Sequence, residues 1–200
     1  MIIVGLTGGI GSGKSTITKH IKKKKIPVFD SDKEVNKLYL NKNKNLLNIV
    51  KKISKNTAIS KKNKINKKIL SNIVFENTKK LKLLERVIFK ILKSKRKVFL
   101  KNNRKRRKKV VFLDAPLLFD IKVSKECKYV ILVKAPIKTR IARIIKRPGM
   151  TKEKAKKIIS KQMSDKRKSK LADFVVQTSF GKWYTLRAVN KIIDEIKKHK

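Results

Sequence analysis

The sequence contains few of the residues that build cross-links or metal centres. Among its 200 residues are one cysteine, Cys127, and two histidines, His20 and His199. One cysteine cannot close a disulfide within the chain, and these three residues do not supply the clustered ligands of a zinc site. We therefore expect neither a disulfide framework nor a transition-metal centre built by the protein.

Long apolar runs are also missing. No segment approaches the roughly 20 apolar residues that are needed to span a bilayer. The opening run, MIIVGL, has neither the basic flank nor the length of a secretion signal, and it leads into a glycine-rich loop. We expect a cytoplasmic protein without a membrane partner. Its length and its hydrophobic fraction of 40% predict one domain, residues 1–200, and we expect a monomer.

Acidic residues are scarce. The chain contains 13 Asp and Glu and 58 Lys and Arg, which gives a net charge of +45. Such a field attracts nucleic acid. The lysines, however, are spread along the chain together with Asn and Ile, whose codons are rich in A and T. Base-composition bias therefore explains the charge better than a localised nucleic-acid site, and we expect only nonspecific contact with nucleic acid. We interpret the densest basic block, residues 93–110, as a solvated connection before a strand.

Short β-branched runs alternate with amphipathic segments along the chain. The runs expected to form buried strands are residues 2–6, 26–30, 110–114, 129–133 and 173–177. Buried runs joined by helical crossovers are typical of a parallel sheet. The sequence predicts an α/β fold with three layers, α/β/α, around a five-stranded parallel sheet. The expected parts are a core of residues 1–32, 110–136 and 171–200, a helical insertion of about 36–108, and a lid of about 137–170.

Residues 5–16, GLTGGIGSGKST, carry the pattern G-x-x-x-x-G-K-[ST], whose fixed positions are Gly8, Gly13, Lys14 and Ser15. In this pattern the glycines let backbone N–H groups turn toward a triphosphate, the lysine reaches the β and γ oxygens, and the hydroxyl ligates Mg²⁺. A chance glycine turn is the alternative, but the preceding strand and following helix are the context that the motif requires. A dinucleotide fingerprint fits less well, because Lys14 stands where its third glycine would fall. The sequence therefore predicts a P-loop NTPase fold that holds nucleotide phosphates and Mg²⁺. The loop alone does not separate kinases from GTPases, motors or DNA-repair ATPases.

Carboxylates follow two of the expected strands. Asp30, Asp32 and Glu34 come after the second strand, at the edge where open α/β sheets bind ligands. A carboxylate there can accept a proton from an acceptor hydroxyl or orient it, and ordinary turn residues are the alternative. Asp114 ends the third strand, where it can help to hold Mg²⁺ through water; its alternative is a turn-forming Asp before Ala-Pro.

Guanidinium groups are rare in this lysine-dominated chain, and three of them, Arg140, Arg143 and Arg147, lie in the expected lid. Such groups clamp phosphates with paired N–H donors and stabilise a phosphoryl group during transfer. A lid that closes over ATP and a solvated basic helix explain these residues equally well. The sequence leaves both interpretations open.

Taken together, these segments resemble the dephospho-coenzyme A kinase family over nearly the whole chain. The similar segments are VGLTGGIGSGKST, IPVFDSD, VVFLDAPLLFD and ADFVVQT, while RPGMTKEKA and the region of Gln162 match the family's lid. The resemblance implies transfer of a phosphoryl group from ATP to the ribose 3′-hydroxyl of dephospho-CoA. The products would be CoA and ADP, as the final step of coenzyme A synthesis.

The resemblance also implies roles for individual residues. Those implied in catalysis are Asp32, Lys14 and Arg140, with Asp32 as the base or as the group that orients the acceptor hydroxyl. Those implied in ATP binding are Gly11, Ser12, Gly13, Lys14, Ser15, Thr16 and Arg147, and those beside the metal are Ser15 and Asp114. The insertion would form much of the acceptor site. Three departures from the family pattern, Asn36, Phe89-Lys90 and Thr178, are expected to bear on acceptor and adenine contacts rather than on the P-loop.

Other functions stay open at this level. A chain similar to a shikimate kinase also pairs a P-loop with Asp-x-Asp after the second strand, although the PLLF and ADFVV segments argue against it. The charge suggests an ATPase stimulated by nucleic acid. Nucleotide binding without catalysis is the third alternative, and it would leave the acids and the lid arginines without a role.

Overall fold

The computed structural model describes residues 1–40 and 43–198, so His199 lies outside the described residues. The chain divides into two compact units, of which the first comprises Met1–Phe29 and Asn103–Lys200 and the second comprises Asp30–Asn102. Among the helices of residues 1–40 and 43–198, none combines the length and the apolar composition that a membrane crossing requires.

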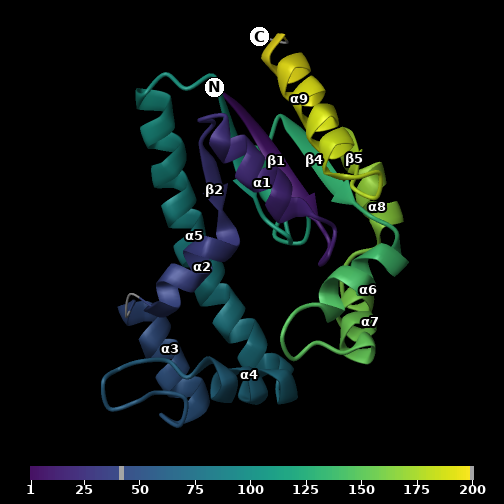
Figure 1. The fold of residues 1–200 in the computed structure, drawn as a ribbon. Helices are drawn as coiled ribbons and strands as arrows, with labels where there is room; N and C mark the ends of the chain where they lie inside the picture. Colours follow the sequence, from purple (N-terminus) through teal and green to yellow (C-terminus); the bar gives the residue numbers. More distant parts are fainter. Residues whose placement is uncertain (41–42, 199–200) are drawn as a thin grey trace. The chain divides into compact units, whose positions relative to one another are not determined.

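The first unit is built on a parallel sheet (Figure 1). Within the described residues, five strands join in the order β2-β3-β1-β4-β5. They are β1 (Ile2–Gly8), β2 (Val28–Asp30), β3 (Val110–Asp114), β4 (Tyr129–Lys134) and β5 (Phe174–Gln177). In the register, Leu6 of β1 pairs with Asp114 of β3 on one side and with Ile131 of β4 on the other. The predicted α/β fold with five parallel strands is confirmed.

Apolar side chains on both faces of the central strand are buried. On one face, Val4 and Leu6 belong to a core cluster with Ile17 of α1 (Lys14–Lys23) and Val189 of α9 (Lys182–Lys198). On the other face, Gly5 lies against the buried Leu118 side chain, and a Cβ at Gly5 would lie 2.7 Å from Leu118 Cδ2. Continuous burial of this kind explains why the strands are apolar throughout rather than alternating.

The remaining helices of the first unit lie between β4 and β5 in the sequence. They are α6 (Ile137–Ile145), α7 (Lys152–Ser160) and α8 (Asp165–Lys170); the 3₁₀ helix η1 (Val123–Glu126) precedes β4. Thr151 caps α7, because its hydroxyl accepts a hydrogen bond of 3.2 Å from the N–H of Lys154. The region expected to form a lid is therefore helical, with a capped second helix.

The second unit is helical. Its helices are α2 (Ser31–Leu40), α3 (Lys44–Ser54), α4 (Lys67–Glu76) and α5 (Thr78–Lys105), and α5 continues past the end of the unit. Asn43 caps α3 and Asn66 caps α4 through side-chain oxygens that accept backbone N–H groups. The buried side chains that form its core include Leu38, Leu46, Val50, Ile53, Leu70, Leu84, Ile88 and Leu92.

The interpretation of residues 93–110 as a solvated connection is wrong. Residues 93–105 continue α5, and only residues 106–109 connect it to β3. The helix persists because Lys and Arg are good helix formers and because one buried stripe runs on at four-residue spacing through Leu92, Arg96 and Leu100. The lysines between these positions hide the stripe in the sequence.

Candidate active site

The P-loop connects the end of β1 to the start of α1. Gly11 and Gly13 have φ angles of 76° and 92°, in the left-handed region that favours glycine. Gly13 is the N-terminal cap of α1, which begins at Lys14. The loop therefore opens onto the positive end of a helix dipole, an arrangement that favours a bound anion.

Gly11 also approaches α6 closely. A Cβ at this position would lie 2.7 Å from the backbone oxygen of Arg140 and 3.1 Å from its Cα. These are backbone atoms, so they cannot rotate away as the end of a flexible side chain can. The glycine thus permits both the turn of the loop and its contact with α6.

We predict that Gly11→Ala lowers the affinity for Mg·ATP by at least about tenfold, because left-handed strain adds to the backbone collision and displaces the loop. Isothermal titration calorimetry measures the change. Gly149→Ala is the matched control, since Gly149 has a φ of 72° and nothing within 4 Å of its Cβ position. Wild-type affinity in Gly11→Ala, or an equal loss in Gly149→Ala, would contradict the prediction.

Lys14 and Asp114 form a salt bridge at the carboxyl edge of the sheet, between Nζ and Oδ1. Asp114 Oδ2 accepts a hydrogen bond of 2.5 Å from Thr18 Oγ1. Asp114 is 3% exposed, so these donors replace the water that its charge has lost. The sequence analysis singled out Lys14 and Asp114 but missed Thr18. Its spacing could have indicated it, because residues four positions apart lie on the same face of a helix.

A cavity of about 360 Å³ opens beside the P-loop. Its lining includes five residues that were expected to bind ATP: Gly11, Gly13, Ser15, Thr16 and Arg147. It also includes Arg143 of the expected lid and Thr178, for which adenine contacts were expected, together with residues that the sequence did not single out: Ser179, Gly181, Lys182 and Thr185. Among the described residues, the lining contains positively charged side chains and no carboxylate, so the cavity suits an anionic ligand. Ser12 is buried, and its Oγ has no hydrogen-bond partner within the described part of the chain.

Arg140 is buried beside the P-loop. Its Nε donates to the carbonyl of Ile10 at 2.8 Å, while Nη1 donates to Asp165 Oδ2 and Nη2 to Gln162 Oε1, both at 3.2 Å. Arg140 is 3% exposed, and Ile144 on the same helix is fully buried. A solvated basic helix therefore does not describe α6. The guanidinium group of Arg140 is bonded to the protein at each of its nitrogens.

Arg143 and Thr178 form hydrogen bonds with the P-loop at Gly11 and Ser12. Arg143 donates to the Thr178 hydroxyl at 2.8 Å and to the Thr178 carbonyl at 2.9 Å. The same hydroxyl donates to the carbonyl of Ser12 at 2.7 Å. The expectation that Thr178 does not bear on the P-loop is therefore wrong. Thr178 follows β5 and its N–H donates to Lys134 at the end of β4, the neighbour of β1, which brings it to the loop.

We predict that Thr178→Val lowers the free energy of unfolding by about 1–3 kcal/mol, because it removes a buried hydroxyl from Ser12 and Arg143 at nearly constant volume. Urea unfolding of both proteins measures the difference. Thr178→Ser is the control, since it keeps the hydroxyl, and it is expected to lose less stability than the valine variant. A valine variant as stable as the wild type would contradict a stabilising role for the hydrogen bonds of the Thr178 hydroxyl.

Asp32 lies in the second unit as the second residue of α2, and its side chain is exposed. Asp30 Oδ1 accepts a hydrogen bond of 3.1 Å from the backbone N–H three residues later. Glu34 forms ion pairs with Lys37 at 2.7 Å and Lys95 at 2.8 Å. Partial burial raises the pKa of Glu34, but the hydrogen bonds and charges of these lysines outweigh it, and the net pKa lies below its ordinary value. Asp30 and Glu34 thus have structural roles within this unit.

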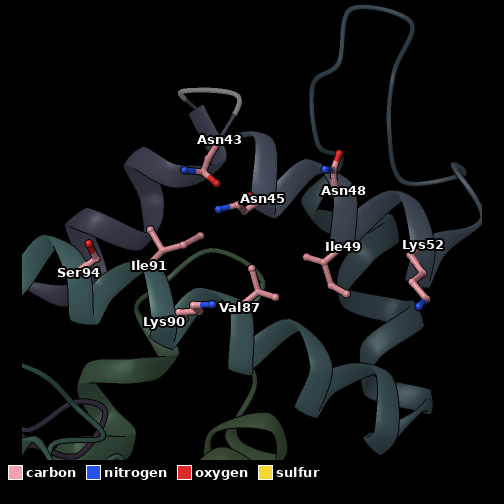
Figure 2. A pocket seen from close by; sticks show the side chains of 9 residues that line it. All are labelled: Asn43, Asn45, Asn48, Ile49, Lys52, Val87, Lys90, Ile91 and Ser94. Carbon is pink, nitrogen blue, oxygen red and sulfur yellow. The ribbon is translucent and has the colours of Figure 1, made fainter.

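The second unit contains a cavity of about 650 Å³ lined by α3, its cap and α5 (Figure 2). Amide, hydroxyl and lysine side chains surround aliphatic ones in its lining: Asn43, Asn45, Asn48, Ile49, Lys52, Val87, Lys90, Ile91 and Ser94. One departure from the family pattern, Lys90, belongs to this lining. Another, Asn36, accepts a hydrogen bond of 3.1 Å from Lys67 Nζ at the start of α4.

The donor set at the P-loop fits Mg²⁺. No group of three or more His, Cys, Asp or Glu side chains comes together in residues 1–40 and 43–198. Mg²⁺ bound with a nucleotide needs only one or two protein oxygens, since phosphate oxygens and water complete its coordination. Ser15 has an exposed side chain at the cavity. The carboxylate of Asp114 contacts Lys14, the residue directly before Ser15. Both supply the hard oxygen atoms that this metal prefers.

Several known proteins are similar to this chain. The family model for dephospho-CoA kinase matches residues 2–182. A dephospho-CoA kinase from Bartonella quintana is 36% identical over 199 residues, covering 100% of both chains. The crystal structure of TT1252 from Thermus thermophilus has a TM-score of 0.81 and 28% identity, covering 96% of this chain and 95% of its own. A dephospho-CoA kinase from Campylobacter jejuni has a TM-score of 0.73 and 27% identity, covering 98% of both chains.

Proposed function

We propose, since this chain belongs to the dephospho-CoA kinase family, that it transfers the γ-phosphoryl group of ATP to the ribose 3′-hydroxyl of dephospho-CoA. The products are CoA and ADP. One observation carries the proposal: in a chain that the family model matches over residues 2–182, the P-loop lysine Lys14 is paired with the strand-end carboxylate Asp114.

The phosphates of ATP would lie against residues 11–16, where the loop meets the N-terminus of α1. The backbone N–H groups there and the helix dipole favour negative charge. Arg147 and Lys182 from the cavity lining add positive charge on the same side of the loop. These features support the assignment of residues 11–16 and Arg147 to ATP.

Lys14 is proposed to stabilise the phosphoryl group during transfer. Its ammonium group has three N–H donors, of which the salt bridge with Asp114 occupies one. The other donors can bind β and γ oxygens of ATP while Asp114 holds the ammonium group in place. A charge that is already positioned needs no reorganisation as negative charge moves toward ADP.

Ser15 and Asp114 are proposed to hold Mg²⁺, which when bound neutralises charge on the β and γ oxygens. Thr18 supports this role of Asp114, because its hydrogen bond at 2.5 Å fixes one carboxylate oxygen. The carboxylate therefore keeps one orientation toward Lys14 and the P-loop.

Asp32 is proposed to orient the 3′-hydroxyl and to accept its proton. The 3′ oxygen forms a bond to the γ phosphorus, and the bond from that phosphorus to the bridging oxygen breaks, with its electron pair leaving on ADP. The position of Asp32 in the first turn of α2, with an exposed side chain, supports this role.

The cavity in Figure 2 is proposed to bind part of the acceptor. Dephospho-CoA carries a pyrophosphate and an arm with amide groups and methyl groups. Lys52 and Lys90 suit the phosphate charge, the asparagines suit the amides, and the aliphatic side chains suit the methyl groups. Lys90 would thus contribute a point charge at a position where this chain departs from its family.

We also propose that the protein acts as a cytoplasmic monomer and that nucleic acid binds it only nonspecifically. The distribution of its lysines supports this view of nucleic acid, because they occur throughout the sequence rather than in one segment. Attraction of this kind weakens steeply as salt is raised.

Incubation of the purified protein with Mg·ATP and dephospho-CoA at moderate salt tests the proposed function. Shikimate, nucleoside monophosphates and single-stranded RNA serve as parallel acceptors or activators, and mass spectrometry detects the products. We expect CoA to form, with no phosphorylation of the other acceptors. ATP hydrolysis that rises with RNA while no CoA forms would contradict the proposal.

A further inference from the structure

The backbone of Ile10, at the centre of the P-loop, is held by two side chains from distant parts of the sequence. Its N–H donates to Gln162 Oε1 at 3.0 Å across 152 positions, and its carbonyl accepts from Arg140 Nε at 2.8 Å across 130 positions. Ile10 lies directly before the residues proposed to bind the phosphates. Both polar groups of its backbone are thus already bonded within the protein.

Gln162 and Arg140 also hold each other. Arg140 Nη2 donates to the same oxygen, Gln162 Oε1, at 3.2 Å, so this oxygen accepts two hydrogen bonds. Arg140 Nη1 pairs with Asp165 Oδ2 at 3.2 Å at the start of α8. The Arg140 side chain is 4% exposed in this pair, so its hydrogen bonds are shielded from water.

The close approach of this pair requires a glycine at position 9. A Cβ at Gly9 would lie 2.3 Å from Arg140 Nη2 and 3.0 Å from Gln162 Oε1. The space that a side chain would take is filled by the two groups that hold Ile10. The contact is therefore part of the packing of the P-loop.

We propose that Gln162 is a positioning residue for ATP binding: with Arg140, it fixes the backbone of Ile10 so that the following N–H groups stay oriented toward the phosphates. A loop with this many glycines has large conformational freedom, and ordering it only when ATP binds lowers affinity. Gln162 and Arg140 order the loop beforehand. This inference rests on the proposed function, since it takes residues 11–16 as the phosphate site.

Two substitutions separate the hydrogen bonds from the shape of the side chain. Gln162→Met keeps the length but removes the acceptor, whereas Gln162→Glu keeps an oxygen that can accept from Ile10 and Arg140. We expect Gln162→Met to raise the KM and the dissociation constant for ATP by about tenfold, with the KM for dephospho-CoA within about twofold of wild type. We expect Gln162→Glu to restore both ATP constants to within about twofold. A purely structural role would not give this split between the two substrates.

Steady-state kinetics measure the two KM values, and calorimetric titration with Mg·ATP measures the dissociation constant for ATP. Unchanged ATP constants in Gln162→Met, or an equal loss in Gln162→Glu, would overturn the inference. If the wild type makes no CoA but Gln162→Met still weakens ATP binding, the inference stands and the proposed function fails.

If Gln162→Met does not fold, hydrogen exchange of the Ile10 amide in the wild-type chain provides the test. Protection of this amide is the expected result, because its N–H is bonded to Gln162. Exchange at the rate of an unprotected amide would overturn the inference.

Discussion

Lys14→Ala is expected to lower kcat/KM for CoA formation by more than about 10³-fold. Lys14 supplies the positive charge at the start of α1, and its salt bridge with Asp114 fixes the position of that charge. CoA formation measured by mass spectrometry gives the size of the loss.

The same substitution leaves the carboxylate of Asp114 without its ionic partner. Asp114 is 3% exposed, so Lys14→Ala also lowers the free energy of unfolding, by about 3–5 kcal/mol. The double variant Lys14→Ala with Asp114→Asn removes the buried charge and is expected to regain stability but not activity. Lys19→Ala, an exposed lysine of the same helix, is the matched control and is expected to keep wild-type activity. Activity of Lys14→Ala close to that of the wild type would contradict the assignment.

Asp32→Asn is expected to lower kcat by about 10²–10⁴-fold while the dissociation constant for Mg·ATP stays within about twofold of wild type. The amide keeps the size of the side chain but cannot accept the proton of the 3′-hydroxyl. Single-turnover CoA formation gives the rate of transfer, and calorimetric titration gives the affinity for ATP.

Asp30→Asn is the matched control for this change. Asparagine can still accept the backbone N–H at the start of α2, so the helix keeps its hydrogen bond and kcat is expected to change less than about threefold. Equal losses of ATP binding and turnover in Asp32→Asn would count against its role toward the acceptor. So would a loss of turnover in Asp30→Asn as large as that in Asp32→Asn.

The parts of the fold with strong local signals could be predicted from the sequence. Apolar runs predicted the strands, and the glycine pattern predicted a loop between β1 and α1. The opposite case is the C-terminal half of α5, where lysines hide a stripe that includes the buried Arg96. The Lys and Arg residues favour a helix here, but composition alone does not show that one face of the segment is buried, and this burial distinguishes the helix from a solvated connection.

The contacts by which Arg140, Gln162 and Thr178 hold the P-loop could not be read from the sequence, because each joins the loop to a residue more than a hundred positions away. The residue pattern alone did not distinguish Arg140, Arg143 and Arg147, and only the family resemblance implied separate roles for Arg140 and Arg147. The structure separates them, since Arg140 holds Ile10, Arg143 holds Thr178, and Arg147 lies exposed in the lining of the cavity. The three arginines have different surroundings because of the strand order and of how deeply each side chain is buried. Spacing along the chain predicts neither the strand order nor the burial.

The most direct test of the central claim follows the phosphoryl group itself. The purified protein is incubated with Mg²⁺, dephospho-CoA and ATP whose γ-phosphoryl group carries oxygen-18 in its non-bridging oxygens, and the labelled product is identified by mass spectrometry and NMR. The label is expected on the ribose 3′-oxygen of CoA, with one ADP formed for each CoA. Label that appears as inorganic phosphate at the same rate with and without dephospho-CoA would contradict the account.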